Sequence, residues 1–135
     1  MERIHPNIKI FRDPKGTFEE RKALLIDFYN RGLDVMSHLK IKKTITIREH
    51  RDTFTINKKT ISFCFGNYKR LKGYWHVLFY VFLHELAHVL GEQCTQHDTC
   101  FWNRFDTILA YAQRRHGLVI PEGQRIYCNK KYVNW

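Results

Sequence analysis

The chain has 135 residues and carries 23 Lys and Arg against 13 Asp and Glu, which gives a formal net charge of +10. This length favours a single domain, and a composition of 44% hydrophobic and 15% aromatic residues excludes a disordered chain. The longest apolar run, 77–83, is much shorter than the roughly 20 residues that a membrane span requires, so the sequence predicts no transmembrane segment.

The first 16 residues carry scattered charges and lack the apolar run of a secretory signal. We therefore expect a basic N-terminal lead over 1–16, one domain over 17–135, and an intracellular protein that is not secreted. The four cysteines form no C-x-x-C pair. In a reducing compartment we expect free or metal-bound thiols, and not a disulfide framework.

The first half of the chain predicts one helix and a small sheet. Thr17 and Glu20 have the spacing of a capping box, and apolar positions recur at helical intervals through 17–39. The run 44–48 alternates like a strand. The β-branched and aromatic runs 53–56 and 60–65 predict a hairpin around 57–59.

The second half predicts two helices. The segment 74–90 is apolar on nearly every face, which is typical of a helix buried on all sides, and Gly91 is placed to end it. Asp98 is a good N-cap for a helix that runs to about residue 116. The run 120–135 shows no clear period. The pattern as a whole predicts a single-domain α+β fold.

The stretch His84-Glu85-Leu86-Ala87-His88 has the spacing of a zinc-binding helix. Residues four apart on an α-helix share a face about 6 Å apart along the axis, so both imidazoles can reach one Zn²⁺. Glu85 can take a proton from the zinc-activated water as a general base. Three unpaired polar groups would be costly to bury in so apolar a helix unless a metal engages them.

A catalytic zinc site has three protein ligands, so a third must come from farther along the chain. Glu92 would stand about 12 Å from His84 along the helix axis, too far for one ion. Cys94 stands where a metzincin has its last histidine, and Gly91 fits that pattern. Metzincins also need a downstream Met-turn, and the methionines here are Met1 and Met36. The metzincin interpretation is therefore rejected.

His97 is the favoured third ligand, because it lies in a loop just before the helix that Asp98 caps. Asp98 can also orient an imidazole as a neighbouring carboxylate. Cys94 and Asp106 remain alternatives to His97. They offer sulfur and oxygen ligands that zinc also accepts.

A rival arrangement uses Cys94, His97 and Cys100 for a closed structural zinc site, with one more ligand such as Cys128. That site would leave the two helix histidines as core residues. The protein would then be a basic nucleic-acid-binding module without catalytic zinc.

Residues 53–105 resemble the WLM and SprT-like zinc metallopeptidases, especially the compact versions found in large DNA viruses. The resemblance rests on the order of four features: the strand-turn-strand TFTINKKTISFCF, a short basic loop, an aromatic helix running into HELAHVL, and a later His-x-x-x-Phe formed by His97 and Phe101. It implies a zincin-like fold that hydrolyses peptide bonds in protein or peptide substrates. It also implies the zinc ligands and the general base, which are His84, His88, His97 and Glu85.

The family places a strand just before the metal helix at the border of the cleft. We therefore expect 60–65 to be the edge strand to which an extended substrate adds. Conceivable oxyanion-stabilising groups are Tyr111, Tyr127, Tyr132 and His116.

Cellular relatives in this family cut proteins crosslinked to DNA. The net charge of +10 suits such substrates, because Lys and Arg spread along a chain bind phosphate without reading sequence. Lys69, Arg70 and Lys72 precede the metal helix and are the candidate DNA contacts.

Overall fold

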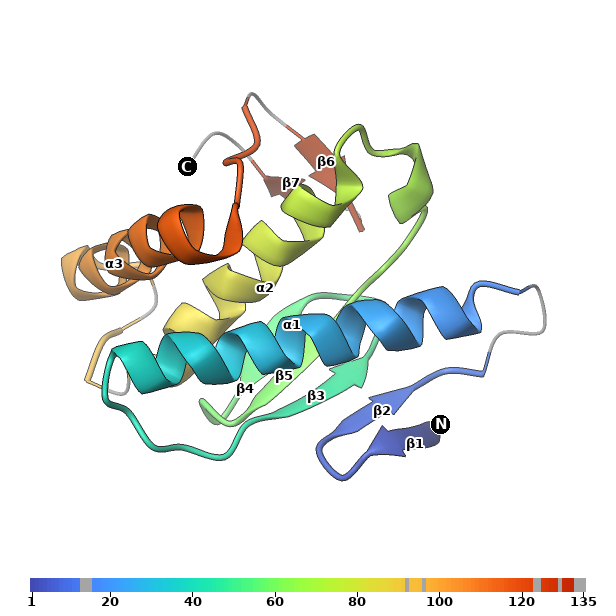
Figure 1. Cartoon of the computed structure of the whole chain (residues 1–135), viewed down its shortest axis with the longest axis horizontal. Coiled ribbons are helices and arrows are strands. Elements are labelled where there is room, and N and C mark those ends of the chain that lie inside the picture. The colour runs from blue at the N-terminus through green and yellow to red at the C-terminus, as the bar shows by residue number, and fades with distance from the viewer. Residues whose placement is uncertain (13–15, 92, 96, 123–124, 129, 133–135) are drawn as a thin grey trace.

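Five strands form one mixed sheet in the order β1-β2-β3-β5-β4, and β6 and β7 form a separate two-stranded sheet (Figure 1). The computed structural model describes residues 1–12, 16–91, 93–95, 97–122, 125–128 and 130–132. The strands are β1 (Glu2–His5), β2 (Ile8–Ile10), β3 (Thr46–Glu49), β4 (Phe54–Ile56), β5 (Thr60–Phe63), β6 (Arg125–Tyr127) and β7 (Lys130–Tyr132). The helices are α1 (Phe18–His38), the short 3-10 helix η1 (Tyr68–Arg70), α2 (Tyr74–Leu90) and α3 (Thr99–His116).

The centre of the main sheet is parallel and its two outer pairs are antiparallel. β2 pairs in parallel with β3, and β3 with β5, whereas β1–β2 and β4–β5 are antiparallel. Parallel neighbours require a crossover connection, and α1 is the crossover between β2 and β3. The expected α+β fold, with an N-terminal helix, a hairpin, a buried motif helix and a C-terminal helix, is confirmed.

The segment expected to be a basic lead supplies two strands of this sheet. Ile8 and Ile10 are fully buried, and Ile8 lies opposite Ile47 of β3. The exposed Lys9 between them completes an alternating strand pattern. A run of three residues among scattered charges was too short to reveal that pattern in the sequence.

The first helix begins next to Thr17 as predicted, but the predicted capping box is absent. The Thr17 side chain makes no capping hydrogen bond and instead accepts one from Nε of Arg21 at 3.1 Å. Glu20 forms an ion pair with Lys69 at 2.8 Å. Thr17 is therefore engaged by the Arg21 side chain of the same helix and Glu20 by Lys69 of η1, and these contacts replace the predicted capping box.

The predicted hairpin is present, but its first strand, β4, lies at the edge of the sheet and its second strand, β5, does not. β5 is paired on both sides, by β3 and β4, so 60–65 is not the edge strand and that expectation was wrong. In the described part of the chain the terminal strands of the main sheet are β1 and β4, so β4 is the edge strand on the side of the hairpin. Asn57 and Lys58 have φ angles of +50° and +52°, the left-handed pair that a tight two-residue hairpin turn requires.

The helix α2 is the centre of the core, as its sequence predicted. Every residue from Val77 to Leu90 is buried except His88, which is half-buried. It packs on β4 and β5, while α3 packs on α1 and α2. No helix in the described residues is long and apolar enough to cross a membrane.

Both helix boundaries near the motif follow the sequence signals. A side chain at Gly91 would come within 3.0 Å of the Ala87 carbonyl oxygen and 3.1 Å of Cys94 Sγ, so the close approach requires glycine. Asp98 caps α3, because its carboxylate accepts a hydrogen bond from the Phe101 backbone N–H at 2.9 Å.

The expectation of unpaired thiols was wrong. Disulfide bonds join Cys64 to Cys128 and Cys94 to Cys100. The first pair is 64 residues apart in sequence, so only the folded chain brings its members together. The second closes a short loop around His97.

Candidate metal centre

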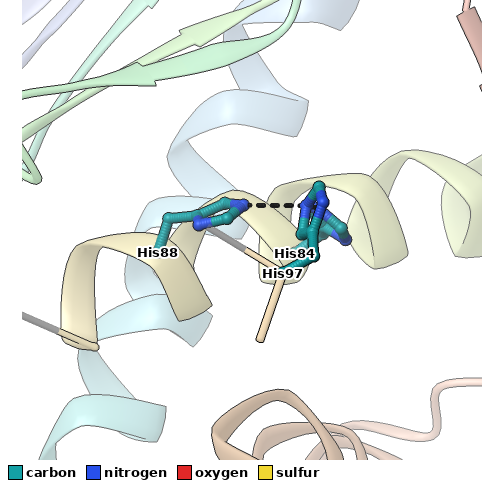
Figure 2. A group of neighbouring side chains, drawn as sticks. All are labelled: His84, His88 and His97. Atoms are coloured by element: carbon teal, nitrogen blue, oxygen red, sulfur yellow. Dashed lines mark hydrogen bonds between the residues drawn. The ribbon is translucent and has the colours of Figure 1, made fainter. Parts of the chain in front are cut away.

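Three imidazoles converge at the carboxyl-terminal half of α2. Figure 2 shows the rings of His84 and His88 from α2 and of His97 from the following loop pointing toward one another. Nε2 of His97 lies 3.0 Å from Nε2 of His84 and 3.2 Å from Nε2 of His88. The loop thus places a third nitrogen donor beside the two that helical spacing brings together.

This donor set fits a zinc ion. Tetrahedral zinc with bonds of about 2.0–2.1 Å keeps its nitrogen ligands roughly 3.3 Å apart, close to the separations found here. A proton on Nε2 of His97 can be shared with only one of the other two nitrogens at a time. A cation satisfies all three nitrogens together.

The histidines lie against an aromatic wall from α3. The ring of His88 stacks on Phe101, with centroids 4.2 Å apart, and His84 lies within 5.2 Å of the Phe105 ring centroid. His84 is 8% exposed, whereas His97 is exposed. One side of the cluster is therefore closed by apolar rings, and the loop side is open to solvent.

Burial lowers the pKa of His88 to about 4, with smaller contributions from His97 and from the positive charge of Lys58. The imidazole of His88 is consequently neutral at neutral pH. A neutral imidazole is the form that ligates a metal.

Glu85 lies on α2 between the two helix histidines and is 7% exposed. Its carboxylate Oε1 accepts a hydrogen bond from the Thr55 hydroxyl at 2.9 Å. Thr55 belongs to the edge strand β4. The candidate base is thus buried beside the metal cluster and in contact with the edge of the sheet.

Several contacts fix the loop that carries His97. Nζ of Lys58 donates to the carbonyl oxygens of Gly91 and Cys94, and the Cys94–Cys100 disulfide closes the loop around His97. The Asp98 carboxylate also accepts from the Thr95 backbone N–H and hydroxyl.

The alternatives for the third ligand do not join the cluster. Cys94 is bonded to Cys100, and Asp106 is exposed on α3 and outside the group of converging histidines. The rival structural site is not formed, because Cys128 pairs with Cys64 while His97 turns toward α2. Glu92 lies outside the described residues.

The three candidate DNA contacts differ in their partners. Lys69 is paired with Glu20, while Arg70 and Lys72 are exposed in the segment before α2.

Two of the four candidate oxyanion-stabilising groups are described, and both face another residue. Tyr111 and His116 both hydrogen bond to Asp34 of α1, between α1 and α3. The side chains of the other two oxyanion candidates, Tyr127 and Tyr132, lie outside the described part.

Sequence reasoning missed Thr55 and Lys58 as parts of the site. Both lie in the predicted hairpin, and strand alternation places Thr55 on the face opposite its two neighbours in β4. That alternation was the available signal for Thr55. Nothing local in the sequence indicated where the Lys58 side chain would reach.

Comparison with known proteins shows a shared fold. No family model matches the sequence, and no curated protein matches it. A crystal structure of Wss1 from Saccharomyces cerevisiae matches with a TM-score of 0.61 and 22% identity, covering 84% of this chain and 95% of that one. A Wss1 mutant from the same organism matches with a TM-score of 0.63 and 20% identity, covering 84% and 98%. At this level of identity the likeness concerns the fold alone.

Proposed function

We propose that this chain is a zinc-dependent metallopeptidase that hydrolyses peptide bonds in protein or peptide substrates. The observation that carries the proposal is the convergence of His84, His88 and His97 beside the buried carboxylate of Glu85. A structural zinc site has four protein ligands, whereas three ligands leave one position for water and substrate. The arrangement therefore favours catalysis over a structural role.

The residues of the chain divide the chemistry between binding and proton transfer. The three imidazoles would hold zinc, which when bound polarises a carbonyl group and makes a water molecule acidic enough to attack it near neutral pH. Glu85 takes the proton from the attacking water and delivers it to the leaving amine. Its low exposure keeps bulk water from competing for that proton.

The open edge of β4 is the favoured docking strand for substrate. In the described part of the chain β4 ends the sheet, and its Thr55 contacts Glu85. An extended peptide can add to such an edge by main-chain hydrogen bonds. Main-chain docking offers little side-chain selectivity, so flexible substrates are preferred over a sharp cleavage motif.

The sequence resemblance and the fold support the same activity. Wss1 is a WLM-domain zinc metalloprotease, and its fold covers most of this chain. The likeness to the compact versions of large DNA viruses rests on the sequence pattern over 53–105 alone.

We also propose that DNA-associated proteins are among the substrates. The support is the net charge of +10 together with the exposed Arg70 and Lys72 in the segment before α2. Lys69 contributes less to this surface, because Glu20 neutralises it. Phosphate contacts of this kind do not depend on sequence.

Glu85→Gln tests the peptidase proposal directly. The variant keeps the three nitrogen donors, so it should retain one zinc per chain and the fold, while cleavage of an unstructured protein falls by about 100-fold or more. A chelator should abolish wild-type cleavage and added zinc should restore it. Equal turnover by wild type and variant would contradict the mechanism. If neither protein cuts but both bind DNA, the nucleic-acid-binding alternative is favoured.

A further inference from the structure

The β4 residue Thr55 makes a contact with α2 that the reaction scheme above does not use. Its Oγ1 lies 2.9 Å from Oε1 of Glu85 and 3.3 Å from the backbone carbonyl oxygen of the same residue. A hydroxyl has one proton and donates to one acceptor at a time. The shorter contact, to the side-chain carboxylate oxygen, is the better hydrogen bond of the two.

The position of Thr55 in the sheet explains why its side chain can reach the base. Thr55 lies opposite Ile61 of β5, and the adjacent Phe54 and Ile56 project to the other face of β4. The helix α2 packs on β4 and β5. A short polar side chain at this one position therefore meets α2 at Glu85.

We infer that Thr55 is a positioning residue for Glu85: its hydroxyl holds the carboxylate in the orientation from which Glu85 exchanges protons with water and substrate. This inference rests on the proposed peptidase function. A general base must lie within hydrogen-bond reach of the proton it abstracts, and a displacement of about 1 Å can cost roughly 100-fold in rate. A glutamate has three rotatable side-chain bonds, so a fixed contact near its end selects one orientation.

The location of this contact on the edge strand links substrate docking to the base. A peptide that pairs with β4 would add backbone hydrogen bonds to the strand that carries the Thr55 hydroxyl. Binding of substrate thereby restrains the donor that orients Glu85. The effect of losing this donor should accordingly appear in kcat and not in KM.

Thr55→Val removes the hydroxyl and keeps the branched shape, whereas Thr55→Ser keeps the hydroxyl. We expect the valine variant to lose about 10- to 100-fold in kcat, the range found when partners behind a metal site are removed, with KM and zinc content unchanged. The serine variant should retain most of the activity. Thr60→Val is the matched control, because Thr60 is on the neighbouring strand and its hydroxyl bonds Thr46 at 2.8 Å.

A double-mutant cycle on the metal-free protein gives a readout that does not depend on activity. Thr55→Val should lower the urea midpoint more when Glu85 is present than in a Glu85→Ala background, where the backbone carbonyl oxygen of residue 85 is still available to the hydroxyl but the carboxylate is missing. Equal shifts in both backgrounds would show that the hydroxyl acts elsewhere and would overturn the inference.

The kinetic outcomes separate this inference from the peptidase proposal. If Glu85→Gln is inactive and Thr55→Val is as active as wild type, the positioning role is wrong and the peptidase stands. If Thr55→Ser is as impaired as Thr55→Val, the loss comes from packing and the positioning role is also wrong. If wild type and Glu85→Gln cleave equally, both proposals fail together.

Discussion

Lys58 donates from its Nζ to the carbonyl oxygen of Cys94 at 2.6 Å and to that of Gly91 at 2.7 Å. One side chain from the β4–β5 turn thus holds the end of α2 and the start of the loop that carries His97. Carbonyl groups at the end of a helix lack partners within the helix, and a cation there also complements the helix dipole.

Lys58→Met should loosen this junction. Hydrogen bonds from a charged donor contribute about 1.5–3 kcal/mol, so we expect a drop of about 2 kcal/mol in the free energy of unfolding and a weaker affinity for zinc. Urea denaturation and competition with a chelator measure the two quantities. Lys59→Met is the control, because Lys59 is exposed beside it. Equal losses in the two variants would show that the junction does not depend on Lys58.

His97→Ala should remove one of the three nitrogen donors while leaving the other two in place on α2. We expect roughly a 100-fold or greater loss of zinc affinity and no cleavage of an unstructured protein. Metal analysis of the purified variant measures the first effect. Asp106→Ala should bind zinc like wild type, since Asp106 lies outside the cluster. Unchanged zinc content in His97→Ala would transfer the role of third ligand to another residue.

The two disulfides should differ in what they stabilise. The chain-entropy model gives about 4 kcal/mol for a loop of 64 residues and about 2 kcal/mol for one of six. Cys64→Ser with Cys128→Ser should therefore lower thermal stability with little effect on zinc. Cys94→Ser with Cys100→Ser should weaken zinc binding, because the loop around His97 gains freedom. Zinc titration of both double variants measures this difference in affinity. An unchanged zinc affinity in the variant that lacks Cys94 and Cys100 would contradict the prediction.

The amount of structure that the sequence revealed depended on how local each signal was. The helices and the hairpin were predictable, because each depends on a local signal that spans only neighbouring residues. These signals are the helical periodicity, the β-branched runs and the Asp98 cap. Strand β2 was not predicted from the sequence, because its burial depends on pairing with Ile47 of β3, and the whole of α1 lies between the two strands in the sequence. The order of β4 and β5 could not be predicted either, since both have strand-like composition.

The candidate site shows the same division. The pairing of His84 with His88 follows from helix geometry alone, and their ligation of zinc stays a prediction. Bringing His97 to them required a loop whose path depends on Lys58 and on Cys94. The Cys64–Cys128 pair joins two distant segments, so no local spacing could reveal it.

Asp34 of α1 and its partners Tyr111 and His116 of α3 form a polar seam between the two helices. We expect this seam to make the stability of the protein depend on pH in the acidic range. The Tyr111 hydroxyl, and with it His116, holds the pKa of Asp34 below its ordinary value against the opposing effect of burial. A lowered carboxyl pKa contributes stability above the ordinary pKa of about 3.8, and this contribution is lost as the pH falls through the folded value. Asp34→Asn should thus destabilise the protein at pH 7 and much less at pH 3.

Thermal unfolding at the two pH values measures this difference for Asp34→Asn and for the control Asp52→Asn. Asp52 is exposed, so its variant should match wild type at both. If Asp34→Asn lowers the thermal stability equally at both pH values, the seam stabilises the protein by packing and not by charge.

If DNA-associated proteins are substrates, DNA should stimulate their cleavage, and the stimulation should fall steeply with salt, because each phosphate contact releases condensed counterion. Reversing the charges of Lys69, Arg70 and Lys72 should weaken the stimulation and leave cleavage of free protein unchanged. Cleavage assays at several salt concentrations, with and without DNA, test this. Stimulation that is absent at low salt, or unchanged in the triple variant, would leave the basic surface without this role.

The five strands of the main sheet all precede α2 in the chain, and this order matters during synthesis. When the most apolar helix leaves the ribosome, the strands against which it packs have already emerged, so its buried face has a partner at once. The face that Phe101 and Phe105 cover must wait for α3. A nascent chain of which residues 1–98 have left the ribosome, with α3 still inside it, should consequently be the form most in need of a chaperone.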